Sequence, residues 1–189
     1  MVELAVSLTV MLIMTAIAIP SLMRSFRSYQ LNDAAGRVSD MLKFTRFEAV
    51  RQNKQVNFLM QWNGTAWIIG VDSNNNGTID VAEKQEVLAG FAALLPAGAP
   101  PSSAPITTYL SVAGLTTLSG NTGSTTAVTF DARGAVRLSI GGVVSTNIDV
   151  FYLGSITNPE YGYRAVILLP SGAVQIWTAP NGGAWQRAG

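Results

Sequence analysis

The chain has 189 residues, 48% of them hydrophobic and 12% charged, with a formal net charge of +1. So small a net charge offers nucleic acid no overall electrostatic attraction. Histidine and cysteine are both absent from the sequence, which excludes an imidazole base, a thiol nucleophile, disulfides and a His/Cys zinc site. Catalysis therefore has little support and we do not expect an enzyme; length and composition indicate one compact domain with an additional helix.

An uncharged apolar run, Leu4 to Ile19, begins directly after Glu3 and ends at Pro20. As a helix the run would be about 24 Å long, slightly shorter than the roughly 30 Å of a bilayer's hydrocarbon core. A carboxylate at the start of such a segment is costly to desolvate. We therefore expect another copy of the protein to neutralise the charge of Glu3. We expect Pro20 to kink the helix or to interrupt it locally.

Three hydroxyls within the apolar run, those of Ser7, Thr9 and Thr15, are expected to bond back to their own helix. A secretory signal peptide and a plain membrane anchor are alternative interpretations of the run. The helical pattern continues well past Pro20, which disfavours the signal peptide.

From Ser21 onward the pattern becomes that of an amphipathic helix. Basic residues outnumber acidic ones as far as Lys54, which we interpret as a solvated helix face that pairs with neighbouring subunits. We divide the chain into residues 1–23, the membrane or filament-core half of the helix, residues 24–54, its amphipathic half, and residues 55–189, a sheet domain. The predicted buried face of the amphipathic half, at steps of three and four, comprises Leu31, Ala34, Ala35, Val38, Met41, Leu42, Thr45 and Ala49.

The segment VELAVSLTVMLIMTAIAIPSL resembles the N-terminal segment of type IV pilins and pseudopilins. In that family a glutamate lies five residues into the mature chain and an Ala-Ile-Ala-Ile-Pro-like run follows; Glu3 and Pro20 keep the family's separation. The resemblance implies that a prepilin peptidase removes a short basic leader, that the new N-terminus is methylated, and that subunits assemble through these helices. It also implies a single-pass position in the bacterial inner membrane before assembly, and an extracellular or periplasmic filament afterwards.

The family's usual Phe and Thr or Ser before Met1 are missing from this sequence. Either the sequence starts late, or the mature chain begins at Met1 and Glu3 is two places early. We favour the first interpretation because it restores the family's register. A basic leader would also resolve a topological conflict, because Arg24 and Arg27 follow the apolar run and alone would place the bulk of the chain in the cytoplasm.

Beyond the helix the pattern becomes that of strands. Residues 55–62 and 65–72 are predicted strands joined by Asn63-Gly64, a signal for a type I′ hairpin turn. A proline-rich loop is expected over 96–105, and a Gly/Ser/Thr connection over 119–126. Further strands are predicted over 127–130, 135–140, 148–153, 163–169 and 173–177, with a short strand or apolar segment over 87–95.

Two strand-turn-strand units, VTFDARGAVRL and VILLPSGAVQI, resemble the paired terminal strands of the GspH/FimT-like branch of pseudopilins and minor pilins. Asp131 and Arg133 within them are interpreted as turn residues. DNA-binding members of the branch tend to carry Gly-Arg-x-Arg at the corresponding places. This chain has Gly134-Ala-Val-Arg137 and Gly172-Ala-Val-Gln175, so most of the phosphate-binding charge is missing and we do not expect nucleic acid as a partner.

The four tryptophans are interpreted as structural residues. Trp62, Trp67 and Trp177 fall on predicted strands, so we expect them in or partly in the core. Trp185 lies in a C-terminal tail that should be mobile unless it docks. A docked tail would cover a sheet edge or contact a neighbouring subunit.

Residues 72–83 fit the twelve-residue calcium-loop template in full. Gly77 permits the tight bend, and Ile79 matches the apolar place that anchors such loops to a core. The strand-like residues 67–71 before the loop exclude a sensor hand that opens a helix pair. We expect weak Ca²⁺ binding, with a Kd of about 10⁻⁴ to 10⁻³ M, and the alternative is an Asn/Gly-rich loop that bonds its own backbone. The expected ligands are Asp72, Asn74, Asn76, Thr78 through its carbonyl, Asp80 and Glu83.

We predict an α+β pilin fold, in which a long N-terminal helix, kinked near Pro20, packs on an antiparallel sheet of roughly five to seven strands. The predicted function is polymerisation into a type IV pilus-like filament, as a homo-oligomer or with other pilins. Glu3 would accept the charged terminal amine of an adjacent subunit, a pairing that fixes register more than it adds stability. The alternatives are a minor pseudopilin of a type II secretion system and a DNA-binding minor pilin for DNA uptake.

Overall fold

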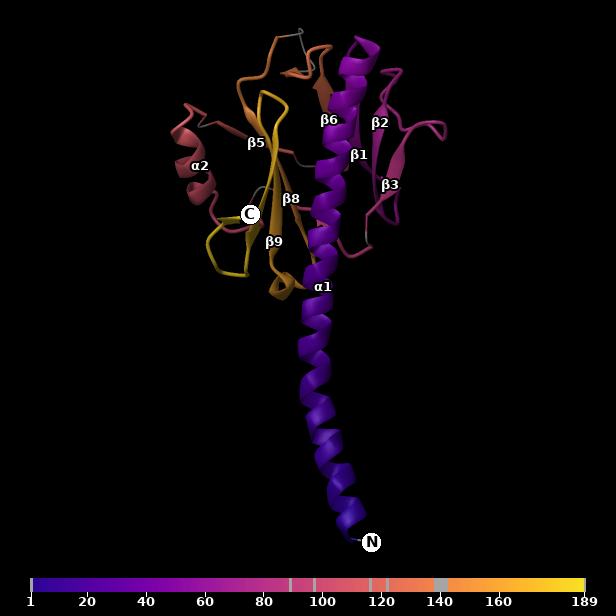
Figure 1. The fold of residues 1–189 in the computed structure, drawn as a ribbon, viewed down its shortest axis with the longest axis vertical. Coiled ribbons are helices and arrows are strands. Elements are labelled where there is room, and N and C mark those ends of the chain that lie inside the picture. Colours follow the sequence, from indigo (N-terminus) through magenta and orange to yellow (C-terminus); the bar gives the residue numbers. More distant parts are fainter. Residues whose placement is uncertain are drawn as a thin grey trace.

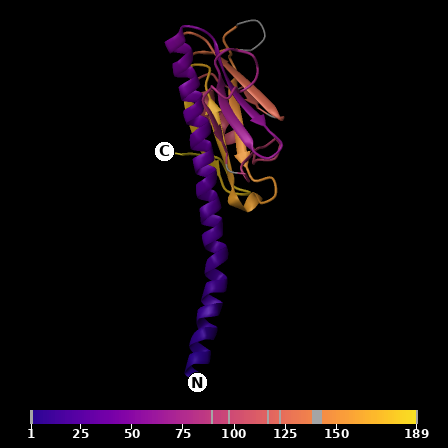
Figure 2. The same cartoon turned by 90° about the vertical axis from the view of Figure 1, so that its right-hand side faces the viewer.

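A computed structural model describes residues 2–88, 90–96, 98–115, 117–121, 123–137 and 143–188. One long helix, α1 (Val2–Gln52), carries a domain of two β-sheets, a short helix α2 (Ala104–Ser111) and a 3-10 turn η1 (Pro159–Tyr161). The first half of α1 extends beyond the domain (Figure 1), and the second half runs along one side of it (Figure 2). The predicted α+β fold is confirmed.

The first sheet has the strand order β3-β2-β1-β6-β7 and is antiparallel throughout. Strands β1 and β2 form the predicted hairpin, and β6 pairs with the other side of β1. The strands are β1 (Val56–Trp62), β2 (Trp67–Asp72), β3 (Gln85–Val87), β6 (Thr125–Phe130) and β7 (Val136–Arg137).

The turn between β1 and β2 differs from the predicted type I′ turn. Trp62 and Trp67 are the last paired residues, so four residues form the loop. Within it only Gly64 has a positive φ, 94°, whereas a type I′ turn needs two such residues. The side-chain oxygen of Asn63 instead accepts two backbone N–H groups of the loop, at 2.8 and 2.9 Å. The hairpin is confirmed, and the turn type is wrong because the Asn63 side chain closes the loop.

The second sheet has the order β11-β10-β9-β8-β4, and β5 pairs with β8 in parallel. The prediction of a single antiparallel sheet is therefore wrong. The predicted 119–126 connection is also partly strand, because β5 and the start of β6 occupy its ends. Of the predicted strand 135–140, residues 138–140 lie outside the described residues. The strands are β4 (Ala93–Leu94), β5 (Leu118–Gly120), β8 (Ile148–Gly154), β9 (Tyr163–Leu168), β10 (Val174–Ala179) and β11 (Gln186–Arg187).

One core lies between α1 and the two sheets, and a second lies between the second sheet and α2. Phe58 of β1 and Phe151 of β8 meet edge to face, with ring centroids 5.5 Å apart, and so join the sheets. All eight residues of the predicted helix face are buried, and all of them except Thr45 belong to the first core. Two further helix residues, Ser39 and Glu48, are buried although the apolar pattern did not predict them.

Pro20 lies inside α1, which stays helical on both sides of it. The predicted local loss of helix is therefore absent at this position. Proline has no N–H to donate to the carbonyl of Ala16, so one helical hydrogen bond is missing there. The ribbon curves gently along its protruding half (Figure 1).

The C-terminal tail is docked on the second sheet. β11 pairs with β10, and the Trp185 Nε1–H donates to the carbonyl of Pro101 at 3.1 Å. The tail therefore covers a sheet edge, which was one of its two predicted roles. Trp67 and Trp177 are buried as predicted, but Trp62 is 42% exposed and lies outside the core.

Candidate functional site

The protruding half of α1, residues 2–23, is the first candidate site; we call it the apolar half. The helix contains an 18-residue window with a mean hydropathy of 2.3, and none of that window is buried in the structure. By length and composition the helix could cross a membrane. The apolar half therefore presents a long hydrophobic surface that no other described part of the chain covers.

Three hydroxyls of the apolar half, those of Ser7, Thr9 and Thr15, bond back to their own helix. Ser7 Oγ donates to the carbonyl of Glu3 at 2.9 Å, and Thr9 and Thr15 make the same bond to the residue four positions earlier, each at 2.7 Å. This confirms the predicted back-bonding of all three hydroxyls. Their side chains therefore add little polarity to the apolar surface.

Glu3 lies in the first turn of α1 and is exposed. A carboxylate at this end complements the positive end of the helix dipole. It forms no ion pair with any other residue in the described part of the chain. Met1, and with it the question of the N-terminal register, lies outside the described residues.

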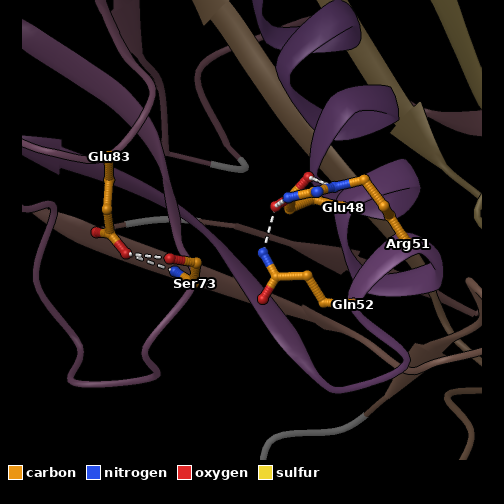
Figure 3. Close-up of polar contacts among 5 residues, drawn as sticks. All are labelled: Glu48, Arg51, Gln52, Ser73 and Glu83. Atoms are coloured by element: carbon orange, nitrogen blue, oxygen red, sulfur yellow. Dashed lines mark hydrogen bonds and ion pairs between the residues drawn. The ribbon is translucent and has the colours of Figure 1, made fainter.

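Each acidic residue of the amphipathic half pairs with a base three or four positions away. Glu48 accepts from Arg51 Nε at 2.9 Å and also from Gln52 (Figure 3). The bond from Arg51 outweighs burial and lowers the pKa of Glu48 below its ordinary value. The excess positive charge of the amphipathic half is therefore carried by the basic residues outside these pairs. The three pairs are Arg37–Asp33, Lys43–Asp40 and Arg51–Glu48.

The loop of residues 72–83 is the second candidate site and connects β2 to β3. Gly77 has a left-handed φ of 82°, as the predicted tight bend requires. Ile79 packs on β2 so closely that a Cβ at Gly70 would lie 2.7 Å from its methyl group. Both observations match the calcium-loop template, and strands rather than helices flank the loop, as predicted.

Within this loop, Asn74, Asn76 and Thr78 gather around Asp80. The amides of Asn74 and Asn76 donate to Asp80 Oδ2 at 2.8 and 3.0 Å. The Thr78 hydroxyl donates to Asn76 Oδ1 at 2.8 Å, and its oxygen lies 3.5 Å from Asp80 Oδ1. Three of the predicted ligand residues thus surround a fourth in this structure. An amide can present its oxygen instead of its nitrogen after a half-turn of its terminal group.

The other two predicted ligands, Asp72 and Glu83, bond to backbone N–H groups. Asp72 is fully buried, and its oxygens accept from the N–H groups of Asn76 at 3.1 Å and Gly77 at 3.0 Å. Glu83 Oε1 accepts from the N–H of Ser73 at 2.6 Å and from its hydroxyl at 2.8 Å (Figure 3). No group of three acidic side chains close enough to hold a metal occurs among the described residues. The loop can therefore close through its own hydrogen bonds.

The terminal strands carry the residues that concern nucleic-acid binding. Arg137 Nη2 lies 2.8 Å from Asp131 Oδ2 in an ion pair. Asp131 also accepts the N–H groups of Arg133 and Ala135, each at 2.9 Å, which confirms its predicted role in the turn. The charge of Arg137 is thus balanced by Asp131.

Arg164, a buried arginine, has a role that was not predicted from the sequence. It is 6% exposed on β9 and donates to Ser28 and Asn32 of α1. The sequence does contain an indication of this role, because Arg164 is a basic residue within an apolar strand that is buried throughout. A lone base in such a strand needs hydrogen-bond partners from another element.

The model of the family described as type II transport protein GspH matches residues 34–172. The chain belongs to the GspH family. Two crystal structures of the type IV minor pilin FimU from Pseudomonas aeruginosa (strain PAO1) are similar to it. One is 15% identical, with 83% of this chain and 96% of that chain covered and a TM-score of 0.48. The other is 14% identical, with 85% and 90% covered and a TM-score of 0.38. No curated protein matches the chain.

In this GspH-family protein the matched residues begin in the buried half of α1 and end in the turn before β10. The predicted membership of the pilin and pseudopilin superfamily, in its GspH/FimT-like branch, is confirmed. The TM-scores lie below 0.5, so the assignment rests on the GspH match. The apolar half precedes the matched residues and is interpreted from its own sequence and geometry.

Proposed function

We propose that this protein is a structural subunit of a pilus-like filament and polymerises through the apolar half of α1. The observation that carries the proposal is the exposure of that half, because a strongly apolar window has none of its residues buried. Isolated soluble proteins rarely expose so large an apolar surface. A membrane before assembly, and a bundle of like helices after it, would each cover the surface.

Glu3 is proposed to set the register of neighbouring helices. In a helix bundle its carboxylate would be costly to bury alone, and the charged terminal amine of an adjacent subunit would neutralise it. Such pairing fixes register more than it adds net stability. Cleavage by a prepilin peptidase and methylation of the new terminus belong to the same proposal and follow from the resemblance of the N-terminal segment.

Replacing Glu3 with Ala tests the proposal. We predict that the Glu3→Ala variant keeps a folded sheet domain but yields at least about tenfold fewer filaments, measured by electron microscopy and by sedimentation of sheared material. Asp40→Ala is the matched control, since it removes one carboxylate from an exposed position on the same helix. Normal filament yield from Glu3→Ala would refute the proposed role of Glu3.

A minor pseudopilin of a type II secretion system is the second candidate, and the description of the matching family favours it. Both candidates use the same assembly through α1, so copy number separates them. Quantitative mass spectrometry of purified filaments would find this chain as a main component in the first case. In the second case it would be present at low copy number beside a distinct major subunit.

We also propose that the 72–83 loop binds Ca²⁺ weakly, through Asp72, Asn74, Asn76, Thr78, Asp80 and Glu83. The full template match and the gathering of side chains around Asp80 support this. Binding requires the Asn74 and Asn76 amides to turn their oxygens inward. Binding also requires the carboxylates of Asp72 and Glu83 each to give up at least one of their present hydrogen bonds and to contact the ion instead.

Thermal unfolding in the presence of calcium tests the loop. If Kd is about 1 mM, then 10 mM Ca²⁺ should stabilise the fold by about 1.4 kcal/mol, and the Asp80→Asn variant should lose most of this effect. Asp40→Asn serves as the control because Asp40 lies on the exposed surface of α1, outside the loop. An unchanged unfolding temperature of the unsubstituted protein at 10 mM Ca²⁺ would leave the loop as a purely hydrogen-bonded connection.

A further inference from the structure

Arg164 is a buried cation with neutral partners. Its Nε donates to Asn32 Oδ1 at 2.5 Å, its Nη2 to Ser28 Oγ at 2.8 Å, and its Nη1 to the carbonyl of Tyr163 at 2.8 Å. No carboxylate of the described residues lies within ion-pair distance of it. Burial accordingly lowers the pKa of Arg164 below its ordinary value. A buried charge without a counter-ion is costly, so an anion at this position would be stabilising.

Arg164 forms part of the wall of a groove of about 600 Å³ between α1 and the second sheet. Arg24 of α1 also lines the groove, as do Ser28 and Tyr29. Glu160 is the one acidic residue along its described lining, and its carboxylate accepts from the amide of Asn158 at 3.2 Å. Two guanidinium groups against one carboxylate leave the groove positively charged.

The groove begins at the level where the apolar half ends. Arg24 follows residue 23 directly. Along the helix axis, Ser28 lies about 7.5 Å beyond residue 23. The interfacial layer of a bilayer is about 5–7 Å thick on each side of the hydrocarbon core. With the apolar half across a membrane, Arg24 would therefore lie among the lipid headgroups, and the groove would begin there and extend beyond them toward Ser28 and Asn32. The exposed ring of Phe26 occupies the same level as Arg24, where aromatic residues commonly anchor membrane proteins.

We propose that this groove binds the phosphate of an anionic phospholipid and thereby holds the sheet domain against the membrane surface before assembly. The proposal rests on the proposed function, because it requires the apolar half to lie in a membrane. Guanidinium groups bind phosphate through paired hydrogen bonds. Ser28 and Asn32 already fix the Arg164 side chain, so little further ordering is needed, while Arg24 completes the site from α1.

Lipid titration of the full chain in micelles of a neutral detergent tests the proposal. The unfolding temperature is measured against increasing phosphatidylglycerol, with phosphatidylcholine and inorganic phosphate as separate arms. We expect stabilisation by phosphatidylglycerol that exceeds both other arms at equal concentration. The Arg24→Gln variant should weaken the apparent affinity about fivefold, and Glu160→Gln should strengthen it by removing the opposing charge.

Arg133→Gln is the matched control, since it removes one exposed positive charge at a turn outside the groove. Arg24 is preferred to Arg164 for substitution because loss of the buried group would also weaken the contact of α1 with β9. An equal response of the Arg24→Gln and Arg133→Gln variants would overturn the proposal. So would equal stabilisation by inorganic phosphate, which would identify a site for free anions.

Filament yield distinguishes the lipid from a neighbouring subunit as the source of the anion. If Arg24→Gln abolished filaments while its response to phosphatidylglycerol stayed unchanged, the groove would instead take a carboxylate of another subunit, and the lipid proposal would fail. The micelle assay does not depend on filaments. Glu3→Ala should therefore bind phosphatidylglycerol normally even where assembly is lost, so the failure of either proposal can be recognised separately.

Discussion

At the scale of single residues, Asp131 shows how one carboxylate holds a turn and an arginine together. Its Oδ1 accepts two backbone N–H groups, and its Oδ2 pairs with Arg137. Burial raises the pKa of Asp131, but the hydrogen bonds from Ala135, Arg137 and Arg133 outweigh it, so the pKa lies below its ordinary value. The ionised carboxylate is therefore favoured in the folded state.

This lowered pKa predicts a dependence of stability on pH. The contribution of Asp131 should be fully present above the unfolded-state pKa of about 3.9 and should be lost as the pH falls through the lower folded-state value. The Asp131→Asn variant should therefore be less stable than the unsubstituted protein at pH 7, with a difference that shrinks below about pH 4. Unfolding temperatures from pH 7 to 3 would check this; a difference independent of pH would contradict it.

The loop of residues 72–83 shows which features residue spacing can predict and which it cannot. Spacing predicted the bend at Gly77 and the packing of Ile79 correctly, because both depend mainly on residue type and position. Spacing does not determine where each oxygen points. Asp72 and Glu83 face backbone N–H groups, and those contacts depend on how the loop folds between β2 and β3.

At the scale of elements, the two terminal strand-turn-strand units meet at α1. Arg46 Nε donates to the carbonyl of Gly134 at 3.1 Å, and Val136 N–H donates to the carbonyl of Pro170 at 3.0 Å. Gly172 has a φ of 79°, and a Cβ there would clash with the carbonyl of Gly134 and lie 2.8 Å from Arg46 Nε. The turns of the two sheets therefore pack together only without a side chain at residue 172.

We predict that Gly172→Ala destabilises the fold by about 1–3 kcal/mol, because it combines a strained backbone conformation with this close contact. Gly182→Ala is the matched control, since Gly182 has a similar φ of 74° but a Cβ there would meet nothing within 4 Å. Unfolding experiments on both variants should find the larger loss for Gly172→Ala. Equal losses would mean that the close contact contributes nothing.

Sequence patterns predicted the elements better than their pairing. The helix face followed from steps of three and four, and all eight of its residues are buried. The hairpin of β1 and β2 followed from local turn residues. The parallel pairing of β5 with β8 joins segments far apart in sequence, and a short strand carries no local signal for its partner. Helix α2 begins inside the loop predicted over 96–105, and that end of the prediction was wrong because Pro105 lies in the first turn of the helix, where a proline is tolerated.

At the scale of the whole molecule, α1 divides into two halves with opposite surroundings. The second half is half-buried against both sheets, where it contacts strands of each. The apolar half projects away from the domain and is covered by no other described part of the chain (Figure 2). This arrangement places the sheet domain on one side of the helix and leaves the apolar half free to pack with like helices.

Electron cryomicroscopy of purified filaments that contain this chain would show whether the apolar half forms the filament core. We expect residues 2–23 to lie along the filament axis, packed against the same segment of neighbouring subunits. The Glu3 carboxylate should then lie within about 4 Å of a neighbour's terminal amine. Filaments in which residues 2–23 lie on the outer surface, away from other helices, would refute assembly through the apolar half.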